Sequence, residues 1–427
     1  MNKLLIPNFP KPYRQILPEI TLSLPLFFIH PPKSGGSTVR TFFDLNLGSG
    51  QFSDFLWNRS RWNDCKQRFS ISKFGGGHLS FGYHRALKMA VDYTTILREP
   101  LARQISHFHY ARSGKNGEVS QGVPVSLTEA GVLRGDISID EWVSESYDDL
   151  NLLTKMVSGH SNPDPTSLQV AKNNLRAHFC TVGTCEDMSS YLLRLCATSG
   201  LQMPFYVEAN RANPKSPASP VSEAAKHKFL EANRLDVELY REASTLIAQD
   251  EQSYGQTFVD ALEQVKHIQR QINAMPNPHV HNSFAFGFDD EHLAKVRTFV
   301  KDCNLDAVQY FLTQAREAKC HEKPDLYEGH VDGILDGVVR GWALNFTRPA
   351  DAVHLKVVCG DRVIATGRTG EPRADVQAAG YETPTAGFSI PLPTDVLSSK
   401  EDVHVLIEGN SQRFPSSGPW RLSWHLA

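Results

Sequence analysis

The sequence predicts an α/β protein in which helices flank a central parallel sheet, followed by a helical linker and a C-terminal all-β sandwich. Two observations carry this prediction. A short apolar strand followed by a loop and a helix occurs twice in the first part of the chain, which is the pattern of α/β folds. From about residue 328 the chain changes to short alternating strands separated by Gly, Asp and Pro turns, as in β-sandwich domains.

These changes of character predict four parts. We expect an N-terminal leader over 1–23, an α/β domain over 24–253, a helical connecting region over 254–327 and a β-sandwich accessory domain over 328–427. The length of 427 residues agrees with two or three domains.

The first strand–loop–helix unit lies near the N-terminus. LPLFFIH (24–30) is a short apolar run bounded by prolines, which predicts a buried strand. STVRTFFDLN (37–46) predicts a helix, because its residues Val39, Phe42 and Phe43 share one helical face.

Further elements follow in the same order. YTTIL (93–97) predicts a second buried strand, and the helix expected after it begins near Pro100, a residue that the first helical turn tolerates. CTVGT (180–184) predicts a third strand after an amphipathic helix over 164–179. The periodic segment 220–249 predicts one long helix.

Composition excludes several classes of protein. A hydrophobic fraction of 41% and a charged fraction of 21% are those of a globular protein with a large core. The net charge of −3 gives no general affinity for nucleic acid or anionic membranes. No apolar run reaches the ~18 residues of a membrane span, and the N-terminus is too broken by proline for a signal peptide. Seven scattered cysteines without a CxxC pair indicate neither a disulfide framework nor a zinc site, so we expect a cytoplasmic protein.

One block of the chain is basic. Residues 33–115 contain thirteen Lys and Arg against five Asp and Glu, within a chain that is acidic as a whole. This block is therefore expected to meet an anion, although a solvated basic face would give the same count.

The segment FFIHPPKSGGSTVR (27–40) has the composition of an anion-binding loop. Gly35 and Gly36 permit close backbone approach at the start of the predicted helix, whose N-terminus attracts anions. Lys33 adds a point charge. The lysine precedes the glycines, whereas a Walker A loop needs GxxxxGK[ST], so Mg²⁺-dependent ATP chemistry is disfavoured. A glycine-rich turn without a ligand is the alternative.

Two segments carry a resemblance to a known family. FFIHPPKSGGSTVR closely resembles the 5′-phosphosulfate loop of sulfotransferases that use 3′-phosphoadenosine-5′-phosphosulfate (PAPS), and TILREPLARQISHFHY resembles their second motif. The similarity covers about residues 24–250 and is closest to carbohydrate sulfotransferases of the heparan-sulfate 2-O and uronyl type. It implies a P-loop-like sulfotransferase fold, PAPS as donor, 3′-phosphoadenosine-5′-phosphate (PAP) as product and no metal.

The resemblance also implies roles for single residues. Lys33 would touch the oxygen that bridges sulfur and phosphorus and stabilise charge on the leaving phosphate. Arg98 and Ser106 would bind the 3′-phosphate. The expected donor-binding residues are Lys33, Ser34, Gly35, Gly36, Ser37, Thr38, Arg98 and Ser106.

Transfer to a sugar hydroxyl needs a base, and His78 is the candidate. It lies between a Gly-rich loop and a predicted aromatic strand, in a segment similar to the H-G-H stretch of the uronyl 2-O-sulfotransferases. His78 matches the second histidine of that stretch, while Gly76 replaces the first. A histidine that titrates near neutrality suits a general base. His84 and Glu99 are the next candidates.

Several basic residues are candidates for contact with an anionic acceptor sugar, although each one taken singly is expected more often as a surface charge. They are Arg59, Arg61, His84, Arg85 and Arg112. The pair His107 and His109 is not expected to bind metal, because side chains two apart on a helix diverge.

The C-terminal segment resembles small β-domains appended to bacterial glycan-modifying enzymes, and its Trp342 is expected to fill the sandwich core. The resemblances together imply a bacterial cytosolic enzyme that sulfates a polysaccharide, such as an exopolysaccharide, or a glycolipid. Two alternatives remain open. One is an inactive glycan-binding or scaffold protein on a sulfotransferase fold, and the other is a nucleotide kinase, which Mg²⁺ dependence would reveal.

Overall fold

The computed structural model describes most of the chain in two compact units. The first unit runs to Phe81 and continues over Val91–Cys320, and the second combines Gly82–Ala90 with His321–Ala427. The described residues are 24–55, 62–113, 119–120, 123–124, 126–145, 150–208, 220–276, 290–318, 325–381, 383–394, 402–408 and 420–421. The predicted leader over 1–23 and the candidates Arg59 and Arg61 lie outside these ranges.

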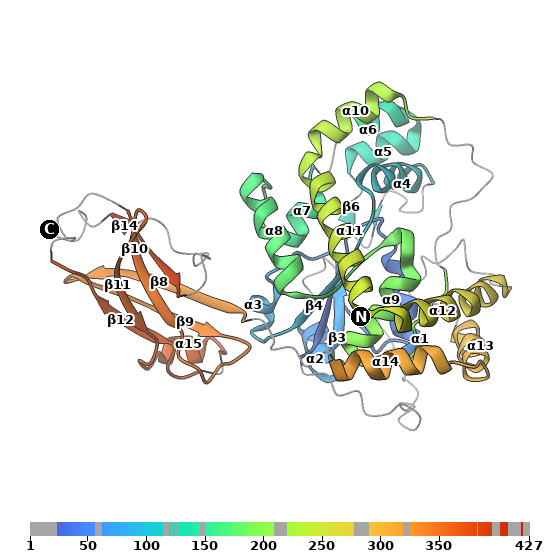
Figure 1. Cartoon of the computed structure of the whole chain (residues 1–427). Coiled ribbons are helices and arrows are strands. Elements are labelled where there is room, and N and C mark those ends of the chain that lie inside the picture. The colour runs from blue at the N-terminus through green and yellow to red at the C-terminus, as the bar shows by residue number, and fades with distance from the viewer. Residues whose placement is uncertain are drawn as a thin grey trace, which may run out of the picture. The chain divides into compact units, whose positions relative to one another are not determined.

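The first unit is built on a five-stranded parallel sheet, so the predicted α/β class with a central parallel sheet is confirmed (Figure 1). In spatial order the strands are β2 Ser53–Asp54, β3 Phe74–Gly77, β1 Leu26–Ile29, β4 Asp92–Leu97 and β7 Phe179–Thr184.

Helices flank this sheet, as expected for an α/β fold (Figure 1). The larger ones are α1 Gly36–Leu47, α2 Trp62–Ser72, α4 Pro100–Arg112, α8 Pro165–Ala177, α9 Met188–Ser199, α10 Glu223–Ala232, α11 Arg234–Tyr254, α12 Gln256–Ala274, α13 Asp290–Lys301 and α14 Asp306–Ala318. The shorter elements are β5 Val119–Ser120, β6 Val123–Pro124, α5 Leu127–Arg134, α6 Ile139–Glu145, α7 Leu152–Ser158 and the 3₁₀ turn η2 Cys185–Asp187.

The single helix predicted over 220–249 is wrong, because α10 ends and α11 begins at Asn233. The side-chain oxygen of Asn233 accepts a hydrogen bond from the amide of Asn151 at 2.9 Å. A tertiary contact of this kind cannot be read from helical periodicity. Within the part of the chain that the structure describes, none of the helices is both long and apolar enough to cross a membrane.

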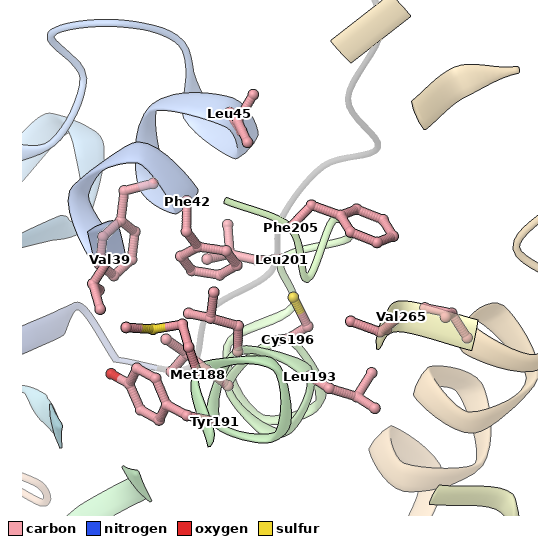
Figure 2. Packing of buried hydrophobic residues seen from close by; sticks show 14 of the residues in the cluster. Val39, Phe42, Leu45, Met188, Tyr191, Leu193, Cys196, Leu201, Phe205 and Val265 are labelled. Carbon is pink, nitrogen blue, oxygen red and sulfur yellow. The ribbon is translucent and has the colours of Figure 1, made fainter. Parts of the chain in front are cut away.

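One large hydrophobic cluster joins α1 to later helices. Val39 and Phe42 of α1, Leu193 of α9 and Val265 of α12 are members of the same cluster (Figure 2). Buried residues of α13 and α14 belong to it as well. Helices α12 to α14, which lie in the segment expected to connect two domains, therefore share the core of the first unit.

Both faces of β1 are buried, which explains its continuous apolar sequence. Phe28 belongs to the large cluster. Phe27 points to the opposite face, where its ring centroid lies 5.5 Å from that of Phe55, 5.9 Å from that of Phe69 and 5.9 Å from that of Tyr93.

The Gly-rich segment before His78 is a strand and not the expected loop, because Phe74–Gly77 forms β3 between β1 and β2. Its neighbours leave no room for side chains. A Cβ on Gly76 would lie 2.1 Å from the carbonyl oxygen of Phe28, and one on Gly77 would lie 2.3 Å from that of Phe55. The aromatic strand expected after His78 is absent, since residues 79–80 have no regular structure, 81–82 form a turn and α3 begins at Tyr83.

The second unit confirms a C-terminal antiparallel β region. One sheet has the order β12-β9-β8 and the other β11-β10-β13-β14, and inward residues of both form one hydrophobic cluster. The elements are β8 Tyr327–Leu335, β9 Val338–Asn345, β10 His354–Cys359, β11 Arg362–Arg368, α15 Ala374–Ala378, β12 Gly387–Pro391, β13 Asp402–Ile407 and β14 Trp420–Arg421.

A short helix from early in the sequence, α3 Tyr83–Leu87, also belongs to the second unit. His84 is buried with its ring centroid 5.4 Å from that of Phe346, just after β9. The Lys88 ammonium lies 4.9 Å from the ring centroid of Tyr381. Trp342 is half-buried against Tyr381, at 5.3 Å, and is not part of the inner cluster, so its expected place in the core is wrong.

Candidate active site

The candidate residues of the first unit follow the carboxyl ends of adjacent strands. Ile29 of β1 pairs with Gly77 of β3 and with Thr95 of β4, so these strands run in parallel at matched levels. Lys33 lies four residues after β1, His78 directly follows β3, and Arg98 directly follows β4. Ligands of open α/β sheets bind at this edge of the sheet, because the loops after the strands meet there.

The loop before α1 is held by the second motif. Lys33 has a left-handed backbone with φ of 67°, and its carbonyl oxygen accepts a hydrogen bond from Nη1 of Arg98 at 3.1 Å. Gly35 precedes α1 with φ of 79°, a conformation that glycine adopts without strain. The structure therefore brings Lys33 and Arg98 together, as the two motifs predict.

The start of α1 offers donors to an anion. Among the described residues no side chain caps the helix, and the hydroxyl of fully buried Ser34 has no hydrogen-bond partner. A Cβ on Gly35 would lie 3.1 Å from both Sγ of Cys185 and Cε of Met188, so a larger residue would crowd this loop. Ser37 and the buried Thr38 lie in the first turn of the helix.

Helix α4 faces the same loop. The Nζ atom of Lys33 lies 3.5 Å from the ring centroid of Tyr110. Ser106 is half-buried one helical turn before Tyr110, and residues four apart lie on the same face of a helix. Ser106 therefore lies on the side of α4 that faces the Lys33 loop.

A second histidine accompanies His78. The ring of His30 lies 4.5 Å from that of His78 and is stacked on Phe28 with centroids 5.5 Å apart. His30 also lies against the start of α1, since a Cβ on Gly36 would come within 1.9 Å of its Nε2 atom. His30 was not a candidate from the sequence. The signal that could have indicated it is its position directly after β1, since His78 occupies the same position after the neighbouring strand β3.

Burial and a nearby cation keep both imidazoles neutral. Burial, and then the charge of Lys33, lower the pKa of His78 to about 4. Burial, His78 and Lys33 lower the pKa of His30 well below its usual value. A neutral His78 is able to accept a proton at neutral pH, but its titration lies below the near-neutral range that we expected from the sequence.

The remaining candidates are not brought to the Lys33 loop by any described contact. Arg112 is exposed at the end of α4. His84 and Arg85 belong to the second unit, where the charge of Arg85 acts on the carboxyl of Glu328. Glu99, a reserve candidate for the base, caps α4 by accepting hydrogen bonds from the amides of Leu101 and Ala102.

Another residue at this edge, Cys185, was not a candidate from the sequence. Cys185 directly follows β7, and burial raises the pKa of its thiol, while the charge of Arg98 opposes that shift. His107 makes a 2.9 Å hydrogen bond with Glu129 of α5. In the described ranges no group of three or more His, Cys, Asp or Glu side chains is arranged to hold a metal ion.

No known protein family matches the chain, and no curated protein matches it.

Proposed function

We propose that the chain is a PAPS-dependent carbohydrate O-sulfotransferase with a P-loop-like sulfotransferase fold. The observation that carries the proposal is the 3.1 Å hydrogen bond between Arg98 and the carbonyl of Lys33 at the ends of two neighbouring parallel strands. It links two motifs 65 residues apart that resemble the two phosphate-binding motifs of that family.

The donor would be held by residues of both motifs. The 5′-phosphosulfate would lie at the start of α1, where the unpartnered hydroxyl of Ser34 is suited to an anion. The 3′-phosphate would be bound by Arg98 and Ser106, because a guanidinium and a hydroxyl both donate to a phosphate monoester. Lys33 would stabilise the charge that grows on the leaving phosphate.

The acceptor would be activated by His78. The acceptor oxygen would form a bond to sulfur while the bond between sulfur and the bridging oxygen breaks, and the hydroxyl proton would pass to the neutral imidazole. The acceptor is a carbohydrate hydroxyl of a polysaccharide or glycolipid in a bacterial cytosol. This assignment rests on the resemblance to glycan-modifying enzymes at both ends of the chain.

Incubation of the full chain with ³⁵S-labelled PAPS and a panel of polysaccharides tests the proposal. We expect label transfer to at least one polymer. Lys33→Ala and His78→Ala should each lower the rate about 10²- to 10³-fold, the scale of a lost charge-stabilising or proton-transfer group. Lys295→Ala, at an exposed position on α13, is the control.

The alternatives give different results in the same assay. A scaffold protein would bind PAP but transfer no label to any polymer. A nucleotide kinase would transfer the γ-phosphate of ATP in the presence of Mg²⁺ and would not use PAPS.

A further inference from the structure

The Lys33 side chain rests against Tyr110, the last residue of the second motif, to which the resemblance assigns no role. Its Nζ atom lies 3.5 Å from the ring centroid of Tyr110, a distance at which the negative face of an aromatic ring attracts a cation. Tyr110 is half-buried on α4, and burial followed by the charge of Glu129 raises the pKa of its phenol. The ring is therefore neutral at neutral pH, and Lys33 is held by its face and not by a phenolate.

An ionised carboxylate adjoins this ring. The hydrogen bond from His107 is the largest cause that lowers the pKa of Glu129, and the charge of Lys33 contributes to the same shift. Glu129 is fixed in place by two contacts, the 2.9 Å bond with His107 and a reciprocal capping box with Ser126 at the start of α5.

The backbone of Lys33 is fixed independently of its side chain. Arg98 holds its carbonyl, and its left-handed φ of 67° is unusual for a residue other than glycine. A lysine side chain otherwise has many rotamers, and ordering it costs free energy. The contact with the Tyr110 ring restricts those rotamers before any ligand is bound.

We propose that Tyr110 is a positioning residue that holds the Lys33 ammonium at the strand ends, with the negative charge of Glu129 favouring the same place, so that the ammonium is in place when a donor anion arrives. This proposal rests on the proposed function and deepens it, because the cation that stabilises the leaving phosphate would be preorganised by α4 and α5. In the same arrangement, the hydrogen bond between His107 and Glu129 would keep the carboxylate in its place. Neither residue contacts the reacting atoms in this account.

The first test does not depend on activity. Competitive acetylation of the full chain with trace acetic anhydride, read at each lysine by mass spectrometry, reports how firmly Lys33 is held. Tyr110→Leu should raise the rate at Lys33 about three- to thirtyfold, the range that a cation–ring contact supports, while Tyr110→Phe should leave it within about twofold. Tyr310→Leu, on an exposed tyrosine of α14, is the matched control.

The second test separates positioning from donor binding. With PAPS and a polysaccharide that accepts label in the panel, Tyr110→Leu and Glu129→Gln should lower kcat about three- to thirtyfold and change PAP affinity less, while Tyr110→Phe should keep the rate. Glu231→Gln, at an exposed position of α10, is the control for the change at Glu129.

The two proposals fail separately. If the unaltered chain neither binds PAP nor transfers sulfate, the proposed function is wrong, and the acetylation result still decides whether Lys33 is held. An acetylation rate at Lys33 that is the same in Tyr110→Leu and in the unaltered chain overturns the positioning role. A Tyr110→Phe variant that is as impaired as Tyr110→Leu also overturns it, because the ring face is then not what matters.

Discussion

At the scale of single residues, the environment of His78 decides what it can do. The ring is partly buried beside His30 and Lys33, and both burial and the lysine charge disfavour its protonation. The result is a neutral imidazole over the whole physiological range. A weaker base is the chemical cost, since proton affinity falls with the pKa.

This environment predicts an unusual pH profile. A base must be deprotonated to act, so kcat/KM for sulfate transfer should stay nearly constant from about pH 7 to about pH 5 and decline only near the pKa of about 4. An unperturbed histidine would lose activity already below about pH 6.5. The measurement is the initial rate across this range with both donor and acceptor at low concentration. A decline centred near 6.5 would show that the site is less buried than described.

The bound donor should raise the pH at which kcat begins to decline in acid. In the proposed complex the phosphosulfate would bring negative charge next to Lys33, which would offset the cation that disfavours imidazolium. The pH dependence of kcat reports the complex, and that of kcat/KM reports the free enzyme. The acid limb, in which the rate declines as pH falls, is therefore expected at higher pH for kcat than for kcat/KM. Coincident limbs would place the base away from Lys33.

At the scale of elements, the strand ends set the positions of the candidate residues. Parallel pairing of β3 with β1 brings His78 beside His30, and pairing of β4 with β1 brings Arg98 to Lys33. The pairing of β3 with β1 depends on the glycines of β3, because they allow the backbones of β1 and β2 to approach β3 closely. The site therefore depends on the absence of side chains in β3.

Gly76→Ala tests this dependence. Its methyl group would lie 2.1 Å from the carbonyl oxygen of Phe28, a backbone atom that cannot yield without moving β1. We expect a loss of about 1–3 kcal/mol in the free energy of unfolding, as for other overpacked cores. The measurement is urea unfolding of the first unit followed by fluorescence.

Gln67→Ala, at an exposed position of α2 in the same unit, is the control. It should change the free energy by less than about 0.5 kcal/mol. Equal losses in the two variants would contradict the close packing of β3.

Sequence reasoning located the elements that have strong local signals. The apolar runs of β1 and β4 predict strands because both faces of these strands are buried. The glycines between β1 and α1 predict the loop. The sequence of β3 predicts a loop because glycine disfavours strands locally. Its glycines are explained only by the close packing of β1 and β2 on either side. The proximity of His30 to His78 depends on strand pairing across 48 residues, which no local pattern encodes.

At the scale of the whole molecule, the two units are not consecutive in sequence. Gly82–Ala90 leaves the first unit after Phe81 and returns to it at Val91, while its helix α3 packs in the second unit. Leu344 and Phe346 are buried there although neither belongs to the inner cluster between the two sheets. The domain boundary expected at 328 takes no account of α3, because its contacts join residues more than 200 positions apart.

The packing of α3 predicts protection from protease. Tyr381 contacts Phe346, Trp342 and Lys88, so Tyr381→Ala should loosen α3 and expose the bonds after Arg85 and Lys88 to trypsin. Tyr381→Phe keeps the ring and should keep the protection. Brief tryptic digestion with mass analysis of the fragments is the measurement. Rapid cleavage after Lys88 in the unaltered chain would show that α3 is not packed in the second unit.

The most direct test of the proposed function is a calorimetric titration of the full chain with PAP in the presence of a metal chelator. The proposed site predicts micromolar binding that does not need metal. Adenosine 5′-phosphate, which lacks the 3′-phosphate, should bind at least about tenfold more weakly, and Arg98→Ala should remove most of that difference, as expected for a lost charge-assisted hydrogen bond. An absence of PAP binding, binding only with Mg²⁺, or equal affinity for the two nucleotides would contradict the assignment of the donor.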